Sequence, residues 1–96
     1  MIIFLKKFGT TLSGRQLGKE AFAAFESSLR DIKNHEEVMV DFEGVITFTP
    51  SWGDEFLSPL LNKFDKQLVL KNTDNLSVQA SLKLLEKIYK KTFKTA

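Results

Sequence analysis

Three short apolar runs alternate along the chain with three longer stretches in which apolar residues recur every three or four positions. This alternation is typical of α/β proteins, in which parallel strands are joined by crossover helices. We therefore predict a small α/β fold in the order β-α-β-α-β-α, with a mostly parallel sheet and covering helices. A chain of 96 residues is expected to form a single domain, residues 1–96.

The expected element bounds follow from the same pattern. The strands are expected at residues 2–8, 38–42 and 67–70, and the helices at residues 14–34, 51–64 and 76–93. Pro59 lies inside the second helix, so we expect a kink or a break there. The connection near residues 47–49 has room for one further short strand.

Composition excludes several classes of site. The chain has no cysteine, which excludes disulfides and thiolate metal sites, and its net charge of +2 is too small to argue by itself for nucleic acid. The apolar run Ile2–Leu5 is followed by two lysines and is too short for a signal peptide or a membrane span. We expect a cytoplasmic protein with no membrane association and no cofactor.

The stretch FGTTLSGRQLG, residues 8–18, has the glycine spacing of a phosphate-binding P-loop. It lacks the lysine and the Ser or Thr that such a loop requires, because Arg15 and Gln16 stand there. The interpretation we favour is a helix start with a capping box between Ser13 and Gln16. Capping does not explain Arg15, which is either a solvated charge or the partner of an acidic group near that end.

A second group of residues lies where a strand, a loop and a helix start follow one another, in residues 41–56. Ser51 and Asp54 have box-like spacing, and Asp54 and Glu55 would lie in the first turn, where the helix dipole favours acidic side chains. On this interpretation Ser51 is an N-cap. Trp52 is either part of the core or an aromatic anchor beside the charges.

Two motifs together resemble a known family. GRQLG at residues 14–18 and VDFEGVITFTPSWGDEFLSPLL at residues 40–61 resemble the STAS-like domain family of unknown function. More distantly, the chain is similar to the STAS domains of anti-sigma-factor antagonists. In those domains an apolar strand ends in Asp, and a D-S-S-G element opens the next helix. Aligning Asp41 with the strand Asp places residues 49–52 over that element, so that Ser51 matches a Ser while its three neighbours differ.

This resemblance implies a function. The similar domains are bacterial signalling modules in which a partner ATPase of the histidine-kinase-like type phosphorylates a Ser at the helix start. By resemblance, we expect a regulatory protein-interaction module whose partner is such an ATPase or an anti-sigma-type regulator. Ser51 is the phosphorylation candidate. The expected partner-binding residues are Arg15, Thr49, Ser51, Trp52, Asp54 and Glu55.

Catalysis is not expected. His35 is the only histidine and lies in a polar stretch, and no second histidine or cysteine is present to complete a metal or nucleophilic site. Asp54 and Glu55 are adjacent, so on a helix they point about 100° apart and do not form a facing acid pair. We predict a protein that is not an enzyme and holds no metal.

The last helix ends in a basic segment. Residues 83–96 contain five lysines and one glutamate. Lysines near a helix C-terminus suit the helix dipole, and they would also suit an acidic partner or nucleic acid. A basic, nucleic-acid-associated small protein is therefore the alternative function.

Overall fold

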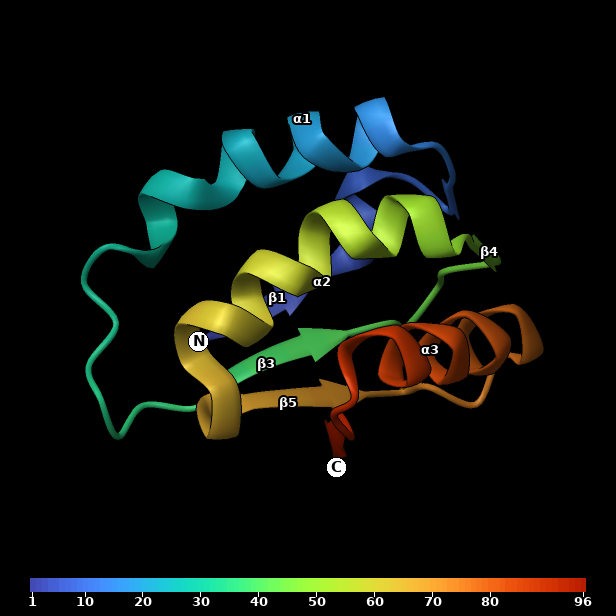
Figure 1. The fold of residues 1–96 in the computed structure, drawn as a ribbon. Helices are drawn as coiled ribbons and strands as arrows, with labels where there is room; N and C mark the ends of the chain where they lie inside the picture. Colours follow the sequence, from blue (N-terminus) through green and yellow to red (C-terminus); the bar gives the residue numbers. More distant parts are fainter.

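The computed structural model describes residues 1–96, and its three α-helices and parallel strands confirm the predicted α/β class (Figure 1). The strands are β1 (Ile2–Phe4), β2 (Thr11–Leu12), β3 (Val38–Asp41), β4 (Thr47–Phe48), β5 (Leu68–Lys71) and β6 (Lys94–Thr95). The α-helices are α1 (Arg15–Phe25), α2 (Pro50–Phe64) and α3 (Leu76–Tyr89), and short 3-10 turns are η1 (Leu5–Phe8), η2 (Glu26–Leu29) and η3 (Asp65–Gln67).

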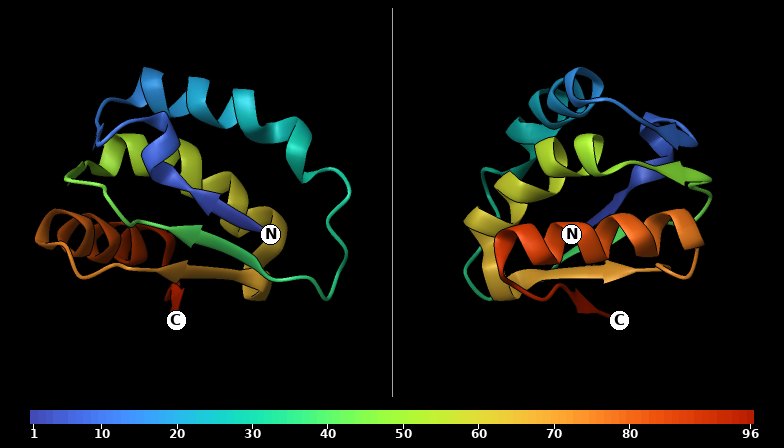
Figure 2. Two further views of the ribbon diagram at one scale, coloured as in Figure 1. Left: turned by 180° about the vertical axis from the view of Figure 1, so that it is seen from behind. Right: turned by 45° about the vertical axis from the view of Figure 1, so that its right-hand side comes forward.

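The main sheet has four strands in the order β1-β3-β5-β6, and every neighbouring pair is parallel. Each crossover moves one strand further in the same direction. Right-handed crossovers in such an order bring all the connecting helices to the same face of the sheet. Figures 1 and 2 show this arrangement, with α1, α2 and α3 on one side of the strands.

Burial along β1 alternates as expected for a sheet whose core lies on one face, whereas Val69 of β5, in the row of Ile2, is also buried. Ile3, Val40 and Leu70 lie in one row across the sheet, and each is completely buried against the helices. Their neighbours in β1 point the other way: Ile2 is 53% exposed and Phe4 is 43% exposed. The hydrophobic core therefore lies between the helices and one face of the sheet.

A second, two-stranded sheet joins β2 to β4, also in parallel. It confirms the short strand expected near residues 47–49, whereas its partner at residues 11–12 was not predicted. The backbone N–H of Thr49 also donates to the carbonyl of Leu12 at 2.9 Å. Because β2 precedes α1 and β4 precedes α2, this small sheet holds the starts of the two helices side by side.

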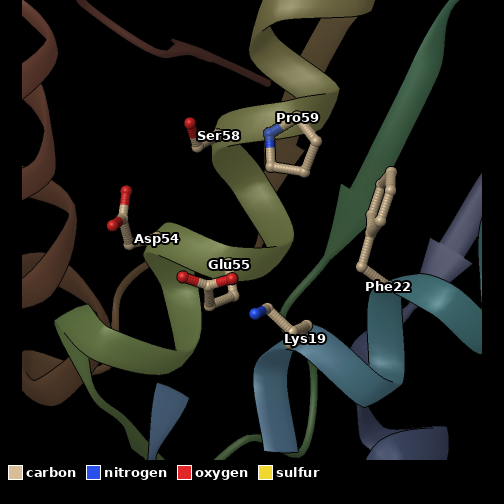
Figure 3. A pocket seen from close by; sticks show the side chains of 6 residues that line it. All are labelled: Lys19, Phe22, Asp54, Glu55, Ser58 and Pro59. Carbon is tan, nitrogen blue, oxygen red and sulfur yellow. The ribbon is translucent and has the colours of Figure 1, made fainter. Parts of the chain in front are cut away.

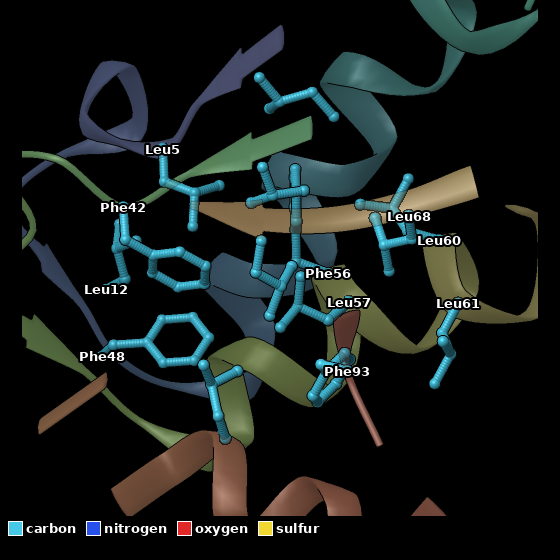
Figure 4. Close-up of a cluster of buried hydrophobic side chains, with 14 of the residues drawn as sticks. Leu5, Leu12, Phe42, Phe48, Phe56, Leu57, Leu60, Leu61, Leu68 and Phe93 are labelled. Carbon is cyan, nitrogen blue, oxygen red and sulfur yellow. The ribbon is translucent and has the colours of Figure 1, made fainter. Parts of the chain in front are cut away.

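The core is built around α2, which lies between α1 and α3 (Figure 1). Aromatic and leucine side chains from α2, from the strands and from the segments next to the strands fill the core (Figure 4). Phe56 is completely buried at its centre, where its ring lies 5.0 Å from that of Trp52 and 5.3 Å from that of Phe8. Because α2 is packed against both α1 and α3, only a narrow strip of its residues, between these two helices, is accessible to solvent.

Three predicted bounds are corrected. The first strand ends at Phe4 and continues as the 3-10 turn η1, and α1 ends at Phe25 instead of residue 34. The last helix ends at Tyr89 because Lys90 adopts a left-handed conformation with φ of +56°, and the chain then returns to the sheet as β6.

The helix α2 continues through Pro59, so the expected break is absent. None of the helices has the length and apolar character needed to cross a membrane.

Candidate partner-binding site

The start of α2 is organised by Thr49, and the prediction that Ser51 is the N-cap is wrong. The Thr49 hydroxyl accepts a long hydrogen bond, 3.4 Å, from the backbone N–H of Trp52. Pro50 occupies the first helical position, where its fixed φ is favourable and its missing N–H costs nothing. The helix therefore begins earlier than expected, and Ser51 lies half-buried inside the first turn.

The start of α1 also differs from the sequence interpretation. Gly14 is the N-cap residue with φ of +87°, and no side chain caps the helix, so the predicted Ser13–Gln16 box is absent. The Gln16 amide instead donates to Glu20 Oε2 at 2.9 Å. Because Thr11–Leu12 form strand β2, this stretch is not a loop that could wrap around a phosphate.

Arg15, at the start of α1, forms ion pairs with two acidic residues of α2. Its Nη1 atom lies 2.8 Å from Asp54 Oδ2 and 2.5 Å from Glu55 Oε2. This confirms the expectation of an acidic partner for Arg15 over that of a solvated charge. The two carboxylates do not lie in the first turn of α2, so their electrostatic partner is the arginine and not the helix dipole.

A residue that the sequence interpretation missed completes the group. The Tyr89 hydroxyl, at the end of α3, donates to Asp54 Oδ1 at 2.6 Å. Asp54 thus accepts hydrogen bonds from α1 and from α3 on its two oxygens. We refer to Arg15, Asp54, Glu55 and Tyr89 as the three-helix cluster. Tyr89 follows Leu82 and Leu85 at helical spacing, a pattern that indicates a packing residue and says nothing of the partner of its hydroxyl.

The charges of the cluster stabilise one another. The hydrogen bond from Tyr89 and then that from Arg15 hold the pKa of the Asp54 carboxyl below its usual value. The same carboxylate, together with Glu55, raises the pKa of the Arg15 guanidinium. Burial, followed by the bond to Asp54, raises the pKa of the Tyr89 hydroxyl. At neutral pH Arg15 and Asp54 are therefore charged, and the phenol of Tyr89 is neutral.

We predict that Tyr89→Phe lowers the free energy of unfolding by about 1–2 kcal/mol at pH 7, because the phenol donates to a charged group. The pKa of Asp54 in the folded protein lies below its unfolded value, so its stabilising contribution is present above a pH of about 4 and is lost as the pH falls through the folded pKa. The difference between wild type and Tyr89→Phe should therefore shrink below pH 4. Urea unfolding at several pH values measures it.

The control for this prediction is the same substitution in an Asp54→Asn background. Without the charge of Asp54 the hydrogen bond from Tyr89 is weaker. Tyr89→Phe should then lower the free energy of unfolding by clearly less, and this loss should no longer depend on pH. An equal cost in both backgrounds would show that the tyrosine acts by packing alone.

Trp52 lies in the core, which confirms that alternative of the sequence analysis and excludes an exposed aromatic anchor. Its side chain is 2% exposed, and it stacks on Phe56 with an interplanar angle of 21°. Gly18 of α1 lies against its backbone, and a Cβ at Gly18 would come within 2.6 Å of the Trp52 carbonyl oxygen. A partner cannot reach this ring without opening the contact between α1 and α2.

Asp41, the strand aspartate of the resemblance, has a structural role. It is 5% exposed, and its Oδ1 accepts hydrogen bonds from the backbone N–H of Glu43 and from the Asn72 side chain. Burial alone would raise the pKa of this carboxyl, but these two bonds together with Lys71 and Lys6 hold it below its usual value. Asp41 therefore ties the end of β3 to the turn after β5.

A shallow pocket adjoins the three-helix cluster, between α1 and α2 (Figure 3). Its volume is about 290 Å³. Glu55 points toward Lys19 across it, and Pro59 and Phe22 form its apolar side (Figure 3). Its lining residues are Lys19, Phe22, Asp54, Glu55, Ser58 and Pro59. The pocket combines charges of both signs with an apolar wall, which suits a protein side chain better than a buried small molecule.

The structure therefore brings together only part of the predicted site. Arg15, Asp54 and Glu55 meet at the surface, whereas Thr49 is engaged in capping and Trp52 in the core. No group of three or more His, Cys, Asp or Glu side chains is placed to hold a metal ion. The site presents charged and hydrogen-bonding groups at the surface.

The comparisons with known proteins give one finding. A family model described as a STAS-like domain of unknown function matches residues 20–78, which include α2 and the second half of α1. Neither the comparison with curated proteins nor that with solved structures finds a match. The matched residues contain Asp54 and Glu55, and Arg15 lies just before them in the chain.

Proposed function

Because the chain belongs to the family of STAS-like domains of unknown function, we propose that it is a regulatory module that binds another protein through the start of α2. The observation that carries this proposal is the three-helix cluster, which presents charged groups at the surface beside the shallow pocket. The Arg15 side chain is 56% exposed, and those of Asp54 and Glu55 are 33% and 22% exposed. A rigid group of partly exposed charges gives a partner fixed hydrogen-bonding positions.

The partner that we propose is a histidine-kinase-like ATPase or an anti-sigma-type regulator in the cytoplasm. This assignment rests on the resemblance to anti-sigma-factor antagonists. The arrangement of the cluster supports it in one respect: the recognition elements come from three helices held by a common core. Because these elements are fixed by a common core, we expect their backbone arrangement to change little when the partner binds.

Ser51 is the proposed control point. It lies in the first turn of α2, where the helix dipole favours a phosphate. The nearby carboxylates would repel a phosphate, but Arg15 pairs with both of them and reduces that repulsion. We propose that phosphorylation of Ser51 adds charge to the surface beside the cluster and weakens binding of the partner.

We expect Ser51→Asp to reduce capture of the partner ATPase at least tenfold, because it places a negative charge in the docking surface. The test is capture from a lysate of the source organism with ATP present, followed by mass spectrometry of the bound proteins and of the recovered bait. The affinity of each identified ATPase is then measured with purified proteins. Ser27→Asp, an exposed serine after α1, is the matched control and should bind like wild type.

A second pair of variants tests the cluster itself. Arg15→Glu should abolish capture, and the double variant Arg15→Glu with Glu55→Arg should retain the intramolecular ion pair but still fail to bind. Restored binding in the double variant would mean that the pair only holds α1 to α2.

Retention of nucleic acid instead of protein, lost on changing Lys87, Lys90 and Lys91, would contradict the proposal and favour the nucleic-acid alternative.

A further inference from the structure

Helix α3 carries an apolar row that its own fold does not use. Leu76, Ala80, Leu84 and Ile88 recur every fourth residue and are all exposed. The exposed fractions of the three large side chains are 81%, 44% and 62%. We call these four residues the α3 ridge. The core is contacted by a different side of the helix, which carries Val78, Leu82 and Leu85.

The spacing of the ridge is that of a helix-packing surface. Residues at i, i+4 and i+8 form the ridges that interlock when two helices cross at about −50°, the commonest packing geometry in globular proteins. Ala80 lies in the middle of the row, where a small side chain lets a second helix approach closely. All four ridge residues are exposed, so no other element of the chain covers this side of α3, a helix at the outside of the fold (Figure 2, right).

Two lysines define the charge beside the ridge. Lys83 and Lys87 each precede a ridge residue, so they form a parallel row next to Leu84 and Ile88. Both are exposed, and neither takes part in an ion pair within the chain. A surface with an apolar row and an adjoining basic row is complementary to a helix with apolar residues on one side and acidic residues beside them.

We propose that the α3 ridge binds an acidic amphipathic helix of another protein. A second copy of this chain fits less well, because pairing α3 with α3 would bring the lysine rows close together. Nucleic acid fits less well because large apolar side chains stand among the basic ones. The proposed contact is separate from the α2 surface and does not depend on Ser51 or on the three-helix cluster.

The experiment uses a panel of fluorescein-labelled 18-residue peptides in anisotropy titrations with the full chain. One peptide has leucines at helical spacing beside glutamates, a second has the same composition in scrambled order, and a third replaces the glutamates with lysine. We expect the acidic amphipathic peptide to bind at least tenfold more tightly than the other two. Amide chemical shifts should change along α3, and affinity should fall as salt is raised.

Matched variants locate the contact. Ile88→Asp should weaken binding at least tenfold, while Leu17→Asp, at a leucine of α1 with 60% exposure, should not. Likewise Lys83→Glu with Lys87→Glu should weaken binding, while Lys33→Glu with Lys66→Glu, which changes the net charge equally, should not. The proposal is overturned if the scrambled peptide binds equally well or if Ile88→Asp binds like wild type. It is also overturned if vesicles of anionic lipid or duplex DNA bind to the ridge and the acidic amphipathic peptide does not.

Discussion

Phe56→Ala is expected to lower the free energy of unfolding by about 4 kcal/mol, which is a large part of the total stability of a domain of this size. Phe56 is completely buried, and its ring contacts those of Phe8, Phe22 and Trp52. Alanine at this position leaves a cavity in the middle of the core that the surrounding helices can fill only in part. Urea unfolding measures the loss, and the fluorescence of Trp52, the only tryptophan, reports it.

The matched control is Phe4→Ala, which deletes the same atoms on the uncovered face of the sheet. Phe4 is 43% exposed, so its loss should cost clearly less, about 1 kcal/mol. Equal losses at the two positions would contradict the assignment of the core to the helix-covered face. In that case the outer face of the sheet would also be buried in the folded protein in solution.

Gly18→Val should lower the free energy of unfolding by about 3 kcal/mol, although glycine is otherwise unfavourable inside a helix. A Cβ at Gly18 would lie 2.6 Å from the carbonyl oxygen of Trp52 and 3.0 Å from its Cα. These are backbone atoms of α2 and cannot rotate away. The substitution must push α1 away from α2, and it should therefore also disturb the ion pairs of Arg15.

Ala24→Val, at an exposed position of the same helix, controls for the lower helix propensity of valine. It should cost no more than about 0.7 kcal/mol. If Gly18→Val is no more damaging than this control, then α1 and α2 separate easily. The close approach of α1 to α2 at Gly18 would then not be required for folding.

The main elements of the fold could be predicted from the sequence because strands and helices differ in the period of their apolar residues. Residues such as Phe56, Leu57 and Leu60 mark α2 by helical spacing, and the run at residues 38–42 marks β3. The two-residue strands at residues 11–12 and 94–95 could not be predicted, since so short a segment has no period. They exist because distant segments provide hydrogen-bonding partners.

The site was only partly predictable. Because capping did not explain Arg15, an acidic partner was one of two alternatives for this residue, and the structure decides for it. The caps were misplaced because Ser13 and Ser51 have the spacing of a capping box but lie one residue before Gly14 and two residues after Thr49, the residues that start the helices. Tyr89 could not be assigned, because its partner Asp54 is 35 residues away in sequence.

The entirely parallel pairing of the strands has a consequence for how the chain folds. Every strand pair joins residues that are between 25 and 37 positions apart, and the fold contains no hairpin. A local turn therefore cannot nucleate the sheet, and the transition state must already bring together at least two distant segments across an intervening helix. Loop-closure entropy makes such a nucleus costly, so we expect refolding in milliseconds or longer and not in the microseconds typical of small helical bundles.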